Sequence, residues 1–348
     1  MIELDGAVGE GGGQILRSGL ALSMCTGKPL RIKRIRARRS KPGLMRQHLA
    51  CVNAAVAISG AKVSGAELGS QELTFEPGAV RAGEHVFKVG TAGSCSLVLQ
   101  TVLPPLMLPT AGGTSRVVLG GGTHNPMAPP FHFLERCFAP LLRKLGVGVD
   151  LDLRRLGFYP AGGGEFTATI TPPAALASPF DILERGALKA SYAEALVPGL
   201  PHRVAERELA VIGLALGWPR DQLRTPPVRG NEGPGNALLL TAMHEHVSEV
   251  VTAFGEKGTT SETVARTALA EYEAYRAAAG ALGPHLADQW MLPLALAVTA
   301  HRSTAAYSCT EMTDHSKTNI GVIEAFLPVR FDVREEAPGR WRVGIAAA

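Results

Sequence analysis

Hydrophobic and polar positions in the first 170 residues follow one order of elements twice. Residues 2–5 alternate like a strand, and apolar residues at helical spacing predict helices over 14–26 and 44–59, ended by Gly27 and Gly60. We expect strands near them at 30–35, 62–67, 72–75 and 85–89. The order recurs with helices at 94–108 and 131–145 and strands at 116–119, 147–153 and 166–171. This recurrence predicts stacked copies of one α+β unit, each a strand, helix, strand, helix and paired strands.

A proline-rich stretch at 171–179 predicts a boundary after which the pattern changes. The elements expected beyond it are strands at 188–195, 237–243 and 249–254 and helices at 202–216 and 261–278. The earlier style then returns, with a helix at 285–300, strands at 305–310 and 329–333, and a helix at 318–326. We therefore expect a large domain of residues 1–180 and 280–348, with a smaller α/β domain, residues 181–279, inserted into it.

The composition is typical of a globular protein: 46% of the 348 residues are hydrophobic and 19% are charged. An aromatic content of 5% argues against an RNA-binding sheet that stacks many bases. The five cysteines are scattered without a C-x-x-C pair, so we expect neither a disulfide scaffold nor a cysteine-rich zinc site, and a cytoplasmic protein. Residues 1–5 lack the form of a signal peptide, and the apolar run at 290–299 is too short to span a membrane. We expect no membrane partner.

Positive charge is concentrated in one segment. The chain has 35 basic and 31 acidic residues, yet nine of the nineteen residues at 28–46 are Lys or Arg and none is acidic. The rest of the chain therefore carries a net −5 (26 minus 31). This local charge follows a glycine-rich turn, residues 9–14 (GEGGGQ), a combination that suits a polyphosphate or a nucleic-acid end. A solvated basic face beside an ordinary turn is the alternative.

The glycine-rich turn offers backbone amides to phosphate oxygens, and the helix expected from Gln14 would point its positive end at them. The spacing is that of neither a P-loop nor a dinucleotide fingerprint. Glu10 fits a phosphate site if a divalent cation bridges it to the phosphates; otherwise it is a surface turn residue. Arg36, Arg38 and Arg39 stand at a strand end, where planar guanidinium groups could grip phosphate oxygens in pairs.

A second polar cluster, residues 309–319, lies between an expected strand and helix. His315 in such a loop could be a nucleophile or an acid–base group, although an ordinary surface histidine is the commoner explanation. A protease-like Cys309/His315 pair is conceivable, but no cysteine-protease signature accompanies it. Asp288 either caps an apolar helix or lies in a nucleotide pocket, and Gln100 needs a buried partner or a ligand. The remaining candidates lack metal spacing and are interpreted as structural: His124, His132, His244 and His246.

Taken together, these segments resemble the RNA 3′-terminal phosphate cyclase family, in order and over nearly the whole chain. The matching blocks are residues 4–7 (LDGA), 9–18 (GEGGGQILRS), 35–36 (IR), 41–44 (KPGL), 46–48 (RQH), 65–71 (GAELGSQ), 92–95 (AGSC), 99–104 (LQTVLP), 157–164 (GFYPAGGG), 286–289 (LADQ), His315, 318–319 (TN) and 326–331 (FLPVRF).

The resemblance implies a large domain of repeated units related to the enolpyruvyl transferases, with a smaller inserted domain. It also implies a reaction: a histidine is adenylylated by ATP, the adenylyl group moves to an RNA 3′-phosphate, and the 2′-hydroxyl displaces AMP to form a 2′,3′-cyclic phosphate. Its cofactors are ATP and a divalent metal, Mg²⁺ or Mn²⁺, and a homo-oligomer is left open. By position the nucleophile is His315, the metal carboxylate is Glu10, the phosphate residues are Arg17, Arg36, Arg39 and Gln47, and the ATP segments hold Gln100, His285, Leu286, Ala287, Asp288 and Gln289.

Three departures from the family pattern matter. Arg38 stands where relatives can have glycine, His285 stands where tyrosine can occur, and residues 310–314 match poorly. Two alternatives follow: a non-catalytic relative that assists ribosome assembly, and an enolpyruvyl transferase. The retained His315 and Glu10 favour the cyclase over the non-catalytic relative.

Overall fold

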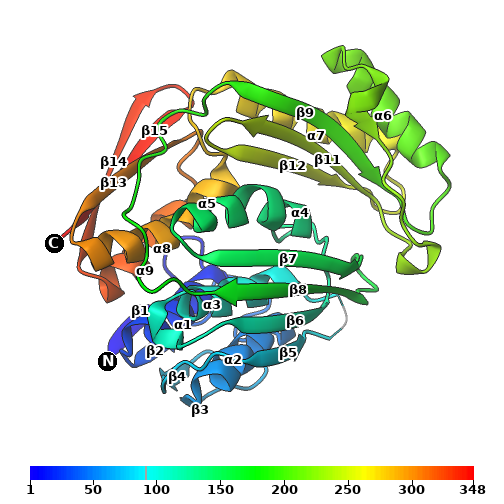
Figure 1. The fold of residues 1–348 in the computed structure, drawn as a ribbon. Helices are drawn as coiled ribbons and strands as arrows, with labels where there is room; N and C mark the ends of the chain where they lie inside the picture. The colour runs from blue at the N-terminus through cyan, green and yellow to red at the C-terminus, as the bar shows by residue number, and fades with distance from the viewer. Residues whose placement is uncertain (91) are drawn as a thin grey trace.

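The first half of the chain forms two four-stranded sheets with the same strand order. In this computed structural model, which describes residues 1–90 and 92–348, the first sheet runs β1 (Ile2–Asp5), β2 (Leu30–Lys33), β4 (Leu73–Glu76), β3 (Lys62–Ser64). The second sheet runs β5 (Glu84–Lys88), β6 (Ser115–Gly121), β8 (Gly164–Thr171), β7 (Gly148–Arg155). In each sheet the first pair is parallel and the other two are antiparallel. The expected mixture of sheets and helices is confirmed (Figure 1).

The C-terminal sheet has three antiparallel strands in the order β13 (Thr304–Cys309), β15 (Arg340–Ala347), β14 (Val329–Ala337). Its free edge is not bare: Ile182 pairs in parallel with Tyr307, and Leu282 pairs in parallel with Cys309. Two short segments thus take the place that β1 and β5 hold in their own sheets. The chain between these segments forms a fourth sheet.

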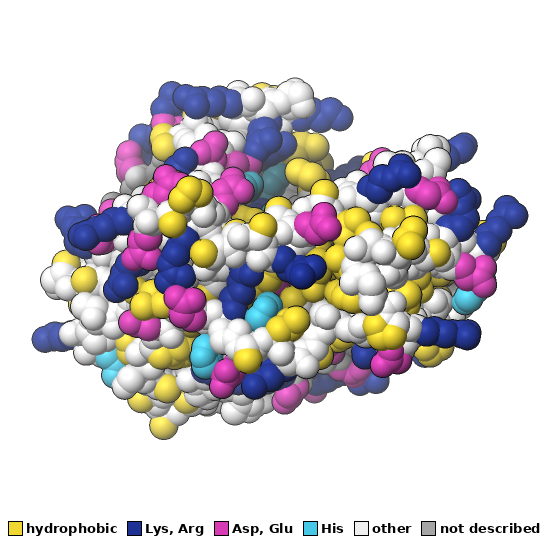
Figure 2. All heavy atoms as spheres, turned by 90° about the horizontal axis from the view of Figure 1, so that it is seen from above, with side chains coloured by type: hydrophobic (Ala, Val, Ile, Leu, Met, Phe, Trp, Pro, Cys, Tyr) yellow, Lys and Arg dark blue, Asp and Glu magenta, His cyan; other side chains and the backbone are white. Residues whose placement is uncertain are grey.

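The fourth sheet runs β10 (Leu223–Arg224), β9 (Leu188–Leu196), β11 (Ala237–His244), β12 (Ser248–Phe254). Two helices pack on it, α6 (Arg203–Leu216) and α7 (Ser261–Ala277), and together they enclose a hydrophobic core of their own. Figure 1 shows this sheet above the second one, with α4 (Phe131–Phe133) and α5 (Ala139–Lys144) between them. Side chains on the face seen in Figure 2 include basic and acidic groups in mixture, around an apolar area.

Helix α1 (Gln14–Thr26) is central because it contacts helices from three parts of the chain. Its neighbours are α2 (Arg46–Ser59), α3 (Cys95–Leu106) and α9 (Asp314–Phe326), and α9 also contacts α8 (Pro284–His301). Gly27 and Gly60 end α1 and α2 in the left-handed conformation, as the sequence predicts. The site described below lies where α1, α8 and α9 meet.

The clearest differences from the expected elements are at four places. Residues 131–145 are not one regular helix, since a π-helical stretch, Leu134–Phe138, separates α4 from α5. The strands β10 and β15 were not expected, although residues 340–345 of β15 (RWRVGI) alternate between polar or small and apolar side chains as a strand does. Helix α9 begins four residues earlier than expected. Across the described residues, none of the helices has the length and apolar character needed to span a membrane.

Candidate functional site

The glycine-rich turn joins β1 to α1 and folds its one carboxylate back on itself. Gly9 and Gly11 adopt left-handed backbones, with φ of 59° and 62°. The Gly12 amide donates to Glu10 Oε2 at 2.7 Å, and a Cβ at Gly12 would collide with that carboxylate. Gly13 is the N-cap of α1 and supplies no side-chain acceptor. The first amides of α1 therefore lack a capping side chain, and their positive end faces the turn.

His315 lies in the first turn of α9 rather than in the expected loop. Thr313 is the N-cap, and its hydroxyl accepts a hydrogen bond from the Ser316 amide at 3.1 Å. This cap starts the helix at Asp314, before the apolar periodicity that the sequence shows from residue 318. The imidazole is fixed to a rigid element while its side chain stays 50% exposed.

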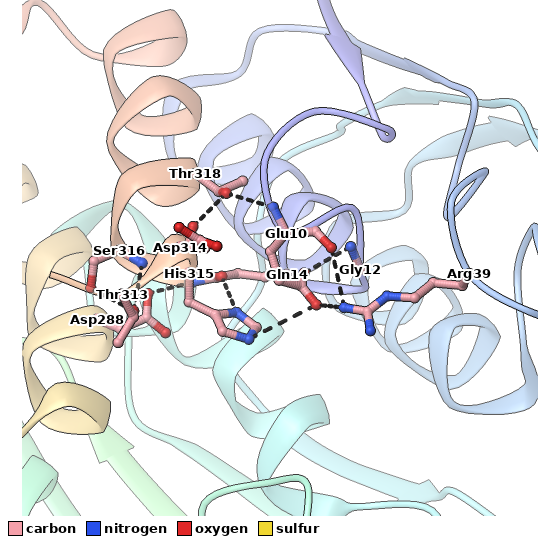
Figure 3. A network of polar contacts seen from close by, with 10 residues as sticks. All are labelled: Glu10, Gly12, Gln14, Arg39, Asp288, Thr313, Asp314, His315, Ser316 and Thr318. Carbon is pink, nitrogen blue, oxygen red and sulfur yellow. Dashed lines mark hydrogen bonds and ion pairs between the residues drawn. The ribbon is translucent and has the colours of Figure 1, made fainter.

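A short relay of hydrogen bonds orients the His315 ring (Figure 3). Gln14 Oε1 lies 2.7 Å from His315 Nδ1, and the other end of the same amide donates to Asp288 Oδ1. A carboxylate can only accept, so the Gln14 amino group faces Asp288 and its carbonyl oxygen faces the ring. Because that oxygen also only accepts, Nδ1 carries the ring proton. The lone pair of a neutral His315 is therefore on Nε2.

The free nitrogen faces the carboxylate of the glycine turn. His315 Nε2 lies 3.9 Å from Glu10 Oε1, and the Glu10 side chain is 12% exposed. Arg39 forms an ion pair with the same oxygen. The Glu10 amide donates to Thr318 Oγ1 at 3.1 Å, so α9 holds the turn by its backbone, and the His315 ring lies beside the Glu10 carboxylate.

Asp288 does not cap a helix, contrary to one of the two interpretations that the sequence allows. Helix α8 begins at Pro284, which places Asp288 in its second turn. The Asp288 carbonyl accepts from Asn319 Nδ2 at 3.2 Å, and Asn319 Oδ1 accepts from the Ser18 hydroxyl at 2.8 Å. Burial raises the pKa of Asp288. These contacts join α8, α9 and α1 around the relay.

A narrow pocket opens beside the relay. Its polar lining includes Gln14, Arg17, Gln100, Asp288 and Gln289, and its apolar walls come from α3, α8 and Phe138. Gln289 Oε1 is buried and has no hydrogen-bond partner. The cavity volume is about 60 Å³, well below the ~300–1,000 Å³ of most ligand sites. A nucleotide would therefore enter only with movement of the lining side chains.

The structure separates the six residues expected at the ATP segments into two groups. Gln100, Asp288 and Gln289 line the pocket. Leu286 and Ala287 are fully buried in the core, and His285 is exposed outside the pocket lining.

Two of the three arginines expected at the phosphate site, Arg17 and Arg36, lie near His48. Burial, with Arg17 and Arg36 nearby, lowers the pKa of His48 to about 3, so the ring is neutral. Its Nδ1 accepts from the Met45 amide at 3.0 Å. Arg36 has a left-handed backbone, with φ of 53°, and its guanidinium donates to the Lys41 and Gly43 carbonyls at 2.6 and 3.2 Å.

Gln47 is held by a hydrogen bond, whereas Arg38 is exposed. Gln47 Nε2 donates to the Ser94 carbonyl at 3.0 Å, which ties the start of α2 to the start of α3. Arg38 is exposed, and its Cβ lies near Gly11 of the turn.

Sequence reasoning missed the residues that organise the site through single contacts. Nothing in the sequence assigns a role to the Gln14 side chain, although Gln14 directly follows three glycines and starts a helix. Thr318 and Asn319 lie three and four residues after His315, and this spacing places them on the same side of α9.

Burial and hydrogen bonding account for Cys309 and for the pair His124 and His132. The Cys309 thiol is buried, donates to the Glu311 carbonyl at 3.4 Å, and has its pKa raised to about 12. It therefore forms no thiolate near neutral pH, and the protease-like pair is excluded. His124 and His132 are bonded to each other at 2.9 Å. Nowhere in residues 1–90 and 92–348 do three His, Cys, Asp or Glu side chains form a metal-binding group.

Comparisons with known proteins match almost the whole chain. The profile of the RNA 3′-terminal phosphate cyclase family matches residues 8–333. An RNA 3′-terminal phosphate cyclase from Pseudomonas fluorescens is 51% identical over 335 residues, which cover 96% of this chain and 94% of the relative. Proteins of the same name from Ralstonia nicotianae and Salmonella typhimurium are 50% and 48% identical; they cover 96% and 97% of this chain and 94% and 97% of their own lengths.

Proposed function

Because this chain belongs to the RNA 3′-terminal phosphate cyclase family, we propose that it converts an RNA 3′-phosphate to a 2′,3′-cyclic phosphate with ATP, through a covalent His315–AMP intermediate. Membership makes the chain an enzyme of that family. The observation that carries the histidine intermediate is the His315–Gln14–Asp288 relay. It leaves one ring nitrogen unprotonated, half exposed and directed at the glycine turn.

In the first step, His315 Nε2 attacks the α-phosphorus of ATP. A phosphorus–nitrogen bond forms, and the bond to the bridging oxygen of pyrophosphate breaks. The attack places positive charge on the imidazole, and the Asp288 carboxylate stabilises that charge through the Gln14 amide. The relay also holds the ring in one tautomer, so no proton has to leave Nε2 before the attack.

In the second step, an oxygen of the RNA 3′-phosphate attacks the same phosphorus and the phosphorus–nitrogen bond breaks. The neighbouring 2′-hydroxyl then attacks the 3′-phosphorus and releases its proton to solvent, and AMP leaves with the electron pair of the broken P–O bond. A phosphate monoester carries about two negative charges and is a poor electrophile. Adenylylation gives it a leaving group, and the histidine intermediate divides one difficult transfer into easier ones.

The pocket beside the relay fits an adenine nucleotide by its chemistry. Gln289 Oε1 is a buried acceptor without a donor, which an exocyclic amine would supply. Arg17 lines the same pocket and would neutralise phosphate oxygens. Glu10 is the carboxylate that would hold Mg²⁺ or Mn²⁺, because such ions are commonly bound by one carboxylate together with substrate phosphates. The metal, when bound, supplies positive charge at those phosphates.

The arginines and Gln47 would hold the RNA phosphate. Arg36 and Arg17 converge on a neutral His48, so the cluster keeps its full positive charge for an anion. Arg39 is fixed by Glu10 beside His315 Nε2. This placement would bring the two phosphates to be joined to one face of the imidazole.

The finer description of the fold belongs to the same proposal. The common strand order of the first two sheets, and the split edge of the third, support repeated units like those of enolpyruvyl transferases. The separate core of the fourth sheet supports a large domain of residues 1–180 and 280–348 with residues 181–279 inserted.

The test is transfer of label from α-labelled ATP, with Mg²⁺ or Mn²⁺, to the protein alone. We expect acid-labile label on the wild type and none on His315→Ala. The matched control is His202→Ala, since His202 is exposed at the start of α6 and pairs with Glu206 far from the relay. Normal labelling of His315→Ala refutes the nucleophile. An unlabelled wild type that turns over enolpyruvyl substrates supports the transferase alternative, and one with neither activity supports the non-catalytic relative.

A further inference from the structure

A second groove lies at the start of α2, apart from the pocket beside the relay. Four segments line it: the first turn of α2, the turn between β3 and β4, residues 89–90 and 92–93 after β5, and the connection between β7 and β8. Its volume is about 680 Å³, which is within the ~300–1,000 Å³ of small-ligand sites. We call it the Tyr159 groove, after the one aromatic residue among its lining side chains.

Tyr159 is an exposed aromatic residue on a rigid support. It is 68% exposed, and it is the one aromatic residue among the large, exposed hydrophobic side chains of the described chain. Its neighbour Phe158 is buried and stacks on His124, with ring centroids 5.4 Å apart. Gly157 and Gly164 close the connection so tightly that a Cβ on either would collide with the other's backbone. The buried ring and the glycine contact thus hold Tyr159 at the groove without using its own surface.

The rest of the groove suits the end of a single nucleic-acid strand. Leu68, 58% exposed, supplies a second apolar surface, and Arg46 is the charged residue of the lining. No acidic residue occurs among the described lining residues. An exposed aromatic ring beside positive charge is the usual means of holding an unpaired base, because every base has a π-face.

Gln47 connects the groove to the proposed phosphate site. Its side chain lines the groove, and it follows Arg46 and precedes His48, around which Arg17 and Arg36 converge. A 3′-phosphate held by these residues would leave the attached nucleoside at the mouth of the groove. We propose that Tyr159 stacks on the terminal base of the RNA substrate and that Leu68 packs against it; this inference rests on the proposed function.

The experiment is equilibrium binding of a 5′-labelled oligoribonucleotide that ends in a 3′-phosphate, followed by fluorescence anisotropy at fixed salt without ATP. Loss of stacking in Tyr159→Ala should raise Kd about 5- to 150-fold. Tyr159→Phe keeps a stacking ring and should change Kd by about twofold or less. Leu214→Ala, which truncates a side chain 89% exposed on α6, is the matched surface control and should also stay within that range.

A second oligoribonucleotide, identical but with an abasic terminal ribose, isolates the contact to the base. The wild type should bind it more weakly, and Tyr159→Ala should weaken it no further. An unchanged Kd for Tyr159→Ala, equal effects on both oligonucleotides, or no wild-type binding to the first one would overturn the proposal. Labelling by ATP should be normal in Tyr159→Ala, which also shows that the variant is folded. Failure of labelling in the wild type counts against the histidine intermediate and not against the groove.

Discussion

Two histidine sites of this molecule have opposite chemistry, although both rings are tied by hydrogen bonds. His315 is half exposed, and only its Nδ1 is engaged within hydrogen-bond distance, by Gln14. His124 is fully buried; its Nδ1 is bonded to the Thr123 hydroxyl and its Nε2 to His132. Burial lowers the pKa of His124 to about 3 and that of His132 well below its usual value.

The comparison supports the proposed role of His315, because a nucleophile needs an available ring nitrogen and not only a histidine side chain. His124 has no nitrogen left for a ligand and no route to solvent. His315 has one nitrogen fixed as a donor, and the other faces Glu10 at 3.9 Å. The surrounding charge does not make this difference, because an arginine is ion-paired at both sites: Arg136 near His124 with Glu194, and Arg39 beside His315 with Glu10.

The largest effect on the labelling rate is expected at Asp288, which fixes the tautomer of His315 through Gln14. In Asp288→Asn the Gln14 amide loses the partner that fixes its orientation and can turn its amino group to His315 Nδ1. The ring then carries its proton on Nε2, which makes it as unavailable as His124. We expect labelling by saturating α-labelled ATP to slow about 10²- to 10⁴-fold, the range found when a catalytic histidine loses its orienting carboxylate.

Asp288 also lines the pocket, so its substitution could act on nucleotide binding instead of on the His315 tautomer. The dependence of the labelling rate on ATP concentration distinguishes these two effects. Rates measured over a range of ATP concentrations should fall mainly in kcat. A change confined to KM would mean that Asp288 holds the nucleotide and leaves the ring unaffected.

A smaller effect is expected from the arginines of the proposed RNA phosphate site. Arg36→Ala or Arg39→Ala removes a charge-assisted contact to phosphate worth about 1.5–3 kcal/mol, so cyclisation of a 3′-phosphorylated oligonucleotide should fall roughly 10- to 150-fold in kcat/KM. Arg38→Ala is the matched control, since Arg38 is exposed in the same segment, and we expect a change of about twofold. Equal losses in all three variants would contradict this ranking.

The smallest effect on catalysis is expected at the buried pair of histidines, His124 and His132. His124→Gln should leave labelling by ATP unchanged but reduce the free energy of unfolding by about 1–3 kcal/mol at pH 8, because buried polar partners lose their bonds. This loss should shrink as pH falls from about 6.5 towards 3. Over that interval the unfolded wild type takes up a proton that folded His124 does not bind, so the wild type itself loses stability.

Denaturant unfolding of wild type and variant between pH 5 and 8 measures this difference. A loss that is constant or grows towards pH 5 would contradict a neutral, buried His124.

The sequence predicted most of the fold because the residues that end helices and form turns act through local backbone preferences. Gly27 and Gly60 end helices at the expected residues, since a left-handed backbone favours glycine whatever surrounds it. The start of α9 was missed because a threonine cap is weaker evidence than periodicity. The alternation of residues 340–345 in β15 was a signal that could have predicted that strand.

The candidate site was less predictable because its contacts join distant parts of the chain. His315 and Gln14 are 301 positions apart, and Gln14 and Asp288 are 274 apart. No local sequence pattern predicts that the Gln14 amide will bridge the His315 ring and the Asp288 carboxylate. Within residues 285–289 the structure places core side chains, Leu286 and Ala287, beside pocket residues, a distinction that a matching sequence segment does not make.

The most direct test of the account is to locate the adenylyl group after incubation with ATP and a divalent metal. Peptide mapping by mass spectrometry should find the mass of one adenylyl group on the peptide that contains His315, lost on brief acid treatment and absent from Asp288→Asn at early times. An adenylyl group on a lysine, a serine or another histidine, or acid-stable modification at His315, would contradict the claim that the relay makes this ring the nucleophile.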